Sequence, residues 1–187
     1  MLRIISKLLN KFAKAYEVLM GHVILVRSGC VCEGPIHLYK HVRLRATDCG
    51  KVRIGARVVI DRYADITVKY GNLRIGDDTY LGQFSVVCAQ DSIEIGRDCL
   101  IAEHVTIRDQ DHIFLGQKPT RASGFVTAPI RIGDNVWLGA KVTVLKGITI
   151  GDNSVIGANS VVSRNIPANS VAVGNPARVI RKIENLS

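Results

Sequence analysis

One spacing dominates this chain: between Pro129 and Val162 an aliphatic residue returns at every sixth position. An α-helix places apolar residues three and four apart and a simple strand places them two apart, so a period of six fits neither. Short strands separated by turns, each with one side chain fixed inward, produce this period, and only stacked copies bury the apolar face. A sandwich of short strands would not keep one phase through six consecutive units. The six positions are Ile132, Leu138, Val144, Ile150, Ile156 and Val162.

The same six-residue period begins weakly near Pro35 and runs to Ile107, which indicates about six coils of three strands. Two steps are longer than six, from Ile66 to Ile75 and from Val87 to Ile95, so extra residues are expected at corners there. The Gly-Asp-Asn sequences at 133–135 and 151–153 are typical of tight corners, which need residues that tolerate a positive φ. The pattern therefore predicts an all-β chain folded as a parallel β-helix.

The six-residue period is interrupted once by a long insertion, which follows Ile107. The next inward residue, Ile132, follows 25 positions later, an excess of 19 residues. A loop of this length in a regular stack is usually functional, and repeat proteins tend to carry such insertions on their binding face. We therefore expect a loop over about 108–131, and His112 stands near its start. Imidazole transfers protons near neutral pH, so His112 is a candidate general base, although a solvated or structural loop histidine would look the same.

The two ends of the chain differ from the repeats and define a predicted division into 1–22, 23–166 and 167–187. Residues 2–20 have apolar side chains three and four apart with Arg and Lys between them, the pattern of a basic amphipathic helix. This helix could pack on its own domain or on a partner subunit, or it could be a peripheral membrane anchor, because such helices bind anionic lipid surfaces. Residues 167–187 are expected to form a closing tail.

Composition narrows the class of partner and the compartment. The formal charge is +9, but Lys and Arg are dispersed and do not interleave with aromatic residues, so nucleic acid is the weakest candidate partner. Five cysteines without metal-ligand spacing indicate free thiols in a reducing cytosol. The start of the chain has no secretory pattern, and no apolar run reaches about 18 residues. We therefore expect a cytoplasmic protein, either free or peripheral to the inner face of the membrane.

Three segments carry a resemblance to a known family, the hexapeptide-repeat acyltransferases. They are Ile132 to Ala140 (IGDNVWLGA), Ile150 to Ala158 (IGDNSVIGA) and Gly174 to Arg178 (GNPAR). Within that family the chain resembles the maltose, galactoside and polysaccharide O-acetyltransferases over about residues 50–182. The resemblance implies a left-handed coil, a homotrimer, and acetyl-CoA as co-substrate in the groove between neighbouring subunits. It implies no metal.

The resemblance also assigns roles to individual residues. The segment from Val105 to His112 (VTIRDQDH) matches the family segment that ends in the general base, so His112 takes that role. Many polysaccharide-type members have a second histidine where this chain has Gln110. The backbone N–H of Ala140 would be the oxyanion donor. Residues implied for binding acetyl-CoA are Trp137, Ala140, Ala158, Ser163, Arg164, Arg178 and Arg181, and those implied for the acceptor are Ser85 and Asp91.

These assignments predict an acetyl-CoA-dependent O-acetyltransferase that acts on a sugar hydroxyl, in the biosynthesis of a surface polysaccharide. A relative that acetylates antibiotics is the alternative within the same class. Two alternatives lie outside it: a zinc hydratase on the same coil, which would need three converging histidines, and a β-helical interaction protein without catalysis. Affinity for CoA separates the enzyme from the interaction protein.

Overall fold

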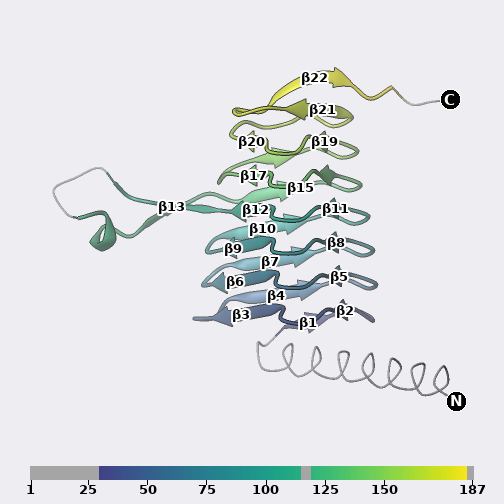
Figure 1. Cartoon of the computed structure of the whole chain (residues 1–187). Coiled ribbons are helices and arrows are strands. Elements are labelled where there is room, and N and C mark those ends of the chain that lie inside the picture. Colours follow the sequence, from purple (N-terminus) through teal and green to yellow (C-terminus); the bar gives the residue numbers. More distant parts are fainter. Residues whose placement is uncertain (1–29, 115–118, 185–187) are drawn as a thin grey trace, which may run out of the picture.

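The computed structural model of the chain describes residues 30–114 and 119–184, and these form a column of stacked parallel coils (Figure 1). Three parallel sheets make the three faces of the column, and the chain passes from sheet A to sheet B to sheet C in each coil. The predicted all-β fold, a left-handed parallel β-helix of hexapeptide repeats with a long inserted loop, is confirmed over these residues. The predicted helix at residues 1–22 lies outside the described part of the chain.

The strands are short because each coil bends at three corners. Sheet A contains β1 (Val31–Cys32), β4 (Lys51–Ile54), β7 (Asn72–Ile75), β10 (Ser92–Ile95), β15 (Ile130–Ile132) and β18 (Thr149–Ile150). Sheet B contains β2 (His37–Leu38), β5 (Val59–Ile60), β8 (Tyr80–Leu81), β11 (Leu100–Ile101), β16 (Trp137–Leu138), β19 (Val155–Ile156), β21 (Ser170–Val173) and β22 (Arg178–Lys182). Sheet C contains β3 (Arg43–Thr47), β6 (Asp65–Lys69), β9 (Val86–Ala89), β12 (Thr106–Arg108), β17 (Thr143–Val144) and β20 (Val161–Val162).

The interior of the column is a stack of buried side chains, most of them aliphatic. Ile54, Ile60 and Ile66 come from the three faces of one coil, and all three are fully buried. Equivalent residues lie directly above one another, as in the register of Ile54 with Ile75 and of Ile75 with Ile95. Because no single coil could bury these side chains alone, the burial that stabilises the fold arises between coils.

The Gly-Asp-Asn corners contain the positive φ that the sequence predicts there. In the corners at 133–135 and 151–153 the positive φ belongs to the asparagines, 53° at Asn135 and 56° at Asn153. The glycine of each corner is required for another reason. A Cβ on Gly133 would lie 2.8 Å from the backbone nitrogen of Asp152 in the next coil, and a Cβ on Gly151 would lie 2.7 Å from the Cα of Ala168. The absent side chain therefore sets how closely consecutive coils approach.

The stack of coils continues beyond the point at which the six-residue period ends in the sequence. Ile166 pairs with Ile150, Ala172 with Ile156, and the Ala177 N–H donates to the Val161 carbonyl at 2.8 Å. One further coil therefore follows Val162, and β22 then turns back antiparallel to β21. The spacing of these inward residues is four, six and five, so a search for a period of six misses this coil. The predicted tail at 167–187 contributes β21 and β22 to the column.

The long insertion forms an arm that leaves the column between sheet C and sheet A (Figure 1). Its two strands, β13 (Gln110–His112) and β14 (Phe125–Thr127), pair antiparallel, and a short 3-10 helix (Thr120–Ala122) precedes β14. At the base of the arm the Ala128 N–H donates to the Asp109 carbonyl at 2.9 Å. No helix among residues 30–114 and 119–184 has the length and apolar character needed to cross a bilayer.

Candidate active site

The predicted site residues are distributed over the two edges of sheet C. His112, Ser163 and Arg164 lie at the edge where sheet C turns to sheet A, the edge from which the arm projects. Ala140 and Ala158 lie at the opposite edge, where sheet B turns to sheet C, and they are stacked in neighbouring coils, because the Asn159 N–H donates to the Ala140 carbonyl at 2.9 Å. One chain therefore presents the two halves of the predicted site on opposite sides of one face.

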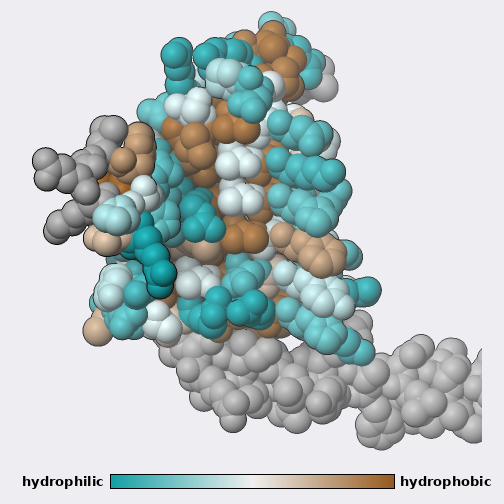
Figure 2. Space-filling model, turned by 60° about the vertical axis from the view of Figure 1, so that its left-hand side comes forward, coloured by the Kyte–Doolittle hydropathy of each residue, from teal (hydrophilic) through white to brown (hydrophobic). Residues whose placement is uncertain are grey.

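His112 lies on the arm and forms part of the wall of a cleft. Its ring contacts Phe125 across the β13–β14 pair, with centroids 4.3 Å apart and planes inclined by 37°. The cleft has a volume of about 370 Å³ and opens on sheet C. Hydrophilic side chains gather on the face of the column next to the arm (Figure 2). The other described residues that line the cleft are Arg45, Asp65, Thr67, Lys69, Val86, Cys88, Ala89, Gln90, Arg108, Gln110 and Phe125.

Asp109 anchors the base of the arm, three residues before His112. Its carboxylate is completely buried and accepts hydrogen bonds from the Gln90 N–H at 2.9 Å and from the Asp91 N–H at 2.8 Å. Burial raises the pKa of Asp109, against the opposing effect of these two N–H donors. Sequence reasoning identified His112 but missed this residue. A carboxylate placed where the coil gives way to the insertion is the signal that could have indicated an anchor.

The Ala140 corner has an uncommitted backbone donor. At the sheet A to sheet B corners, the N–H of Arg97 donates to Asp134 at 3.0 Å and the N–H of Asp134 donates to Asp152 at 2.9 Å. Ala140 occupies the matching place at the other corner, where the coil above has Ala158 instead of a carboxylate. Among the described residues the Ala140 N–H has no acceptor. This donor is free for a ligand, as the predicted role in an oxyanion hole requires.

The remaining predicted acetyl-CoA residues lie on sheet B and at the C-terminal end of the column. Trp137 projects outward from β16 and is 52% exposed. Arg178 and Arg181 are exposed on β22 and are paired with Val173 and Val171 of β21. All three side chains are accessible to a ligand, and they belong to the same end of the column as Ala158. Their proposed contacts with the nucleotide remain predictions.

The acceptor assignments need one correction. Ser85 is 0% exposed, and its hydroxyl donates to the Ala102 carbonyl at 3.0 Å, so it cannot contact an acceptor. Ser85 stands two positions before the inward Val87, and this place in the repeat is filled by inward side chains throughout the column. The repeat register therefore already contained the information that excludes it. Asp91 is half-buried beside the cleft, whereas its neighbour Gln90 is part of the wall.

The thiols do not provide a nucleophile. All five cysteines are free, as predicted, and Cys88 is the one that lines the cleft. Burial raises the pKa of Cys88, which keeps its thiol protonated and weakly nucleophilic. No three His, Cys, Asp or Glu side chains within the described ranges lie close enough together to hold a metal ion.

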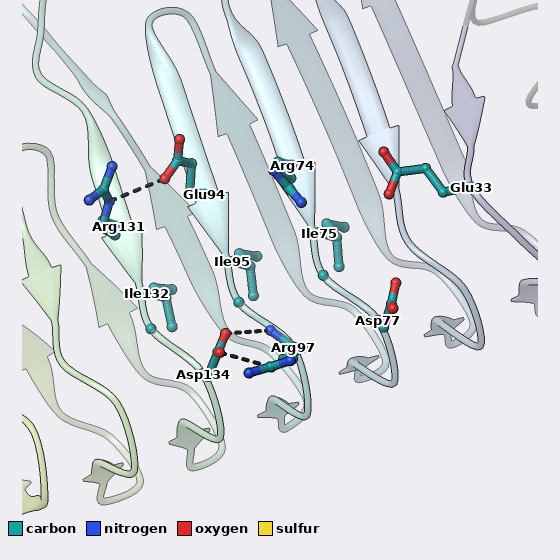
Figure 3. Close-up of a pocket in the computed structure, with 13 residues that line it drawn as sticks. Glu33, Arg74, Ile75, Asp77, Glu94, Ile95, Arg97, Arg131, Ile132 and Asp134 are labelled. Carbon is teal, nitrogen blue, oxygen red and sulfur yellow. Dashed lines mark hydrogen bonds and ion pairs between the residues drawn. The ribbon is translucent and has the colours of Figure 1, made fainter.

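A larger hollow, of about 570 Å³, lies on sheet A and contains none of the predicted site residues (Figure 3). Its charged side chains largely neutralise one another. Arg131 pairs with Glu94 at 3.1 Å and Arg97 pairs with Asp134 at 2.9 Å. The hollow contains no histidine, whereas the cleft beside the arm contains His112, so that cleft is the candidate site.

Comparison with known proteins gives a consistent result. The family model described as the hexapeptide repeat of succinyl-transferase matches residues 72–107 and 129–164. The galactoside O-acetyltransferase of Escherichia coli is 44% identical over 119 residues, which are 62% of this chain and 57% of that protein. The crystal structure of a maltose O-acetyltransferase from Clostridium difficile 630 is 34% identical, with a TM-score of 0.61, and the alignment covers 88% of this chain and 75% of that one.

A more distant structure shares the fold alone. An N-acyltransferase from Bacillus cereus, solved in complex with dTDP and 3-hydroxybutyryl-CoA, is 20% identical, with a TM-score of 0.73 over 86% of this chain and 87% of that one. The chain spans about half the length of the curated relatives it matches.

Proposed function

The chain belongs to the hexapeptide-repeat acyltransferase family, and from this premise we propose that it transfers an acetyl group from acetyl-CoA to a hydroxyl of a sugar. Its relatives include enzymes named for galactoside and maltose O-acetylation, which supports both the donor chemistry and the class of acceptor. The observation that carries the proposal is the Ala140 N–H, which has no acceptor among the described residues. Ala140 belongs to the coil next to that of the His112 arm.

The reaction needs two groups from the protein. His112 takes the proton from the acceptor hydroxyl while that oxygen attacks the thioester carbonyl carbon. The carbonyl oxygen gains negative charge, which the Ala140 N–H stabilises by hydrogen bonding. The tetrahedral intermediate then collapses: the C–S bond breaks and the new C–O bond is kept. The protonated imidazole gives its proton to the leaving CoA sulfur. The transfer is direct, which agrees with the protonated state of the Cys88 thiol.

The two halves come from two copies of the chain. His112 with Ser163 and Arg164 forms one edge of sheet C, and Ala140 with Ala158 forms the other, so one protomer does not bring both edges to one acetyl group. A homotrimer places the His112 edge of each copy against the Ala140 edge of the next. We assign the arginines of β22, Arg178 and Arg181, to the nucleotide phosphates of CoA, since charge-assisted bonds to phosphate are strong. Trp137 covers the same groove.

The biological setting follows the same reasoning. We propose a polysaccharide precursor as the acceptor and the cytoplasmic side of the membrane as the place of reaction, with residues 2–20 as the segment that would contact lipid. A panel of neutral and charged sugars, followed by release of the CoA thiol, tests the donor and acceptor together.

The decisive variant is His112→Ala, with His37→Ala as its control, because His37 lies on β2, in the first coil of sheet B, and outside the cleft. We expect His112→Ala to keep the trimer and CoA binding and to lower turnover by about two to four orders of magnitude, the usual contribution of a general base. Thermal stabilisation by CoA reports binding independently of turnover. Turnover near that of the wild type in His112→Ala would remove this residue from its role, and absence of CoA binding would leave a non-catalytic β-helix.

A further inference from the structure

The cleft beside His112 owes its shape to four side chains in register on sheet C. Arg45, Thr67, Cys88 and Arg108 lie above one another on β3, β6, β9 and β12. Neighbouring strands are about 4.8 Å apart, so the two arginines are separated by about 14 Å at their backbones. Thr67 and Cys88 are short and the arginines are long. The hollow therefore has Arg108 at one end and small side chains on its floor. At the other end, the Arg45 guanidinium donates a hydrogen bond to the Thr67 hydroxyl at 3.2 Å.

The charges around this hollow do not balance. Three cations line it, Arg45, Lys69 and Arg108, together with one carboxylate, Asp65. Asp65 is already engaged, by Arg43 at 3.4 Å and by Arg45 at 3.8 Å. It also accepts a hydrogen bond from the Thr67 hydroxyl at 3.2 Å. The carboxylate is therefore not available to neutralise the cations on the arm side.

Those cations have weak partners or none. Lys69 is 3.9 Å from Asp48, an exposed pair of the kind that contributes little. The Arg108 side chain makes no hydrogen bond or ion pair with any residue in the part of the chain that the structure describes. Arg108 is the last residue of β12, shortly before the arm. Gln90 and Gln110, two neutral hydrogen-bonding side chains, complete the wall between Lys69 and His112.

We propose that the acceptor carries an anionic group, a phosphate or a carboxylate, which Arg108 binds with help from Lys69. This inference rests on the proposed acetyl transfer and names the class of acceptor for it. A planar guanidinium binds either anion through paired N–H donors, and such bonds are stronger than those between neutral groups. With its anion at Arg108, the acceptor lies along the floor of the hollow and its hydroxyl reaches the imidazole of His112.

Matched acceptors test the inference: glucose, glucose 1-phosphate and glucuronic acid, each assayed for kcat/KM with the wild type and with Arg108→Gln. We expect the anionic sugars to be preferred over glucose, and Arg108→Gln to lower kcat/KM for them by about 10- to 100-fold, the effect of losing a hydrogen bond to a charged group. The value for glucose should stay within about threefold. The two anions differ in charge and geometry, so their ratio identifies which source the site prefers.

Arg74→Gln is the matched control. Arg74 is an exposed arginine of sheet A that also lacks an ion pair with any described residue, and it lies outside the cleft (Figure 3). It should change none of the three values. Calorimetric titration with glucose 1-phosphate in the absence of acetyl-CoA repeats the comparison without turnover, and loss of binding in Arg108→Gln alone is expected.

The outcomes separate this inference from the proposed function. If glucose is used as well as its charged analogues and Arg108→Gln leaves their ratio unchanged, the anionic acceptor is refuted while acetyl transfer stands. A smaller oligomer for Arg108→Gln, with the same ratio between acceptors, would make Arg108 a contact between copies and also refute it. Failure of the wild type to bind either anion would refute it as well. Acetyl transfer itself fails if no sugar is acetylated and CoA does not bind.

Discussion

Replacing Asp109 by Ala should loosen the arm that presents His112, because its carboxylate is the acceptor for two backbone donors at the arm's base. The Gln90 and Asp91 N–H groups would lose their partner, and each unpaired donor in a buried place costs about 1–3 kcal/mol. Gln90 and Asp91 are half-buried, so water can satisfy part of the loss, and we take about 1–2 kcal/mol for each. The total is about 2–4 kcal/mol.

Native-state hydrogen exchange measures this loss at the affected amides. Since about 1.4 kcal/mol corresponds to a factor of ten, protection of the Gln90 and Asp91 amides should fall about 30- to 700-fold. The control is Asp111→Ala, which removes a partly exposed ion pair with Lys146 (2.6 Å) and should cost about 1 kcal/mol. In acetyl transfer, Asp109→Ala should lower kcat with little change in the KM for acetyl-CoA. Equal loss of protection in the two variants would refute the anchor.

Three further predictions concern the cofactor, the packing and the pH dependence. Arg178→Ala should raise the KM for acetyl-CoA more than it lowers kcat, and steady-state kinetics showing only a rate effect would exclude a phosphate contact. Gly96→Ala should lower the unfolding free energy by about 1–3 kcal/mol, since its Cβ would meet backbone at 2.5 Å, whereas Gly124→Ala, with open space and a φ of 80°, should cost about 1 kcal/mol in chemical denaturation. The hydrogen bond from Arg57 lowers the pKa of Asp78, so this carboxylate stabilises the fold above its ordinary pKa and loses that effect as the pH falls through the lowered value. Arg57→Ala should therefore raise the Asp78 pKa in an NMR titration, and an unchanged value would show that the pair does not persist in solution.

Much of the architecture could be predicted because it repeats. Each inward aliphatic residue, such as Ile132 or Ile150, makes the same contact with the coils above and below. Aliphatic residues therefore recur at a fixed spacing in the sequence. Where the coils become irregular, this spacing is lost. The last coil, with Ile166 and Ala172, is packed like the others, but Pro167 and unequal spacing hide it.

The candidate site was only partly predictable, since a site is defined by distances between residues that are far apart in the chain. His112 could be predicted as a site residue because it lies near the start of the long insertion in the six-residue repeat. Ser85 was misjudged because its neighbours in sequence resemble an acceptor-binding segment, while its position in the repeat turns it inward. Asp109 gained its importance from the backbone of Gln90 and Asp91, one coil below. The sequence shows its place before the insertion, but it does not show which donors its carboxylate meets.

The amino-acid sequence by itself determined the coil, the number of its faces and the place of the insertion, because these follow from which residues must avoid water at a fixed interval. The tertiary structure alone decided which outward side chains meet. Residues such as Arg45 and Arg108, more than 60 positions apart, share one hollow only because three parallel strand pairings bring them into register. Charge and shape at a surface arise from such cross-coil neighbours, and the order of residues along the chain does not contain them.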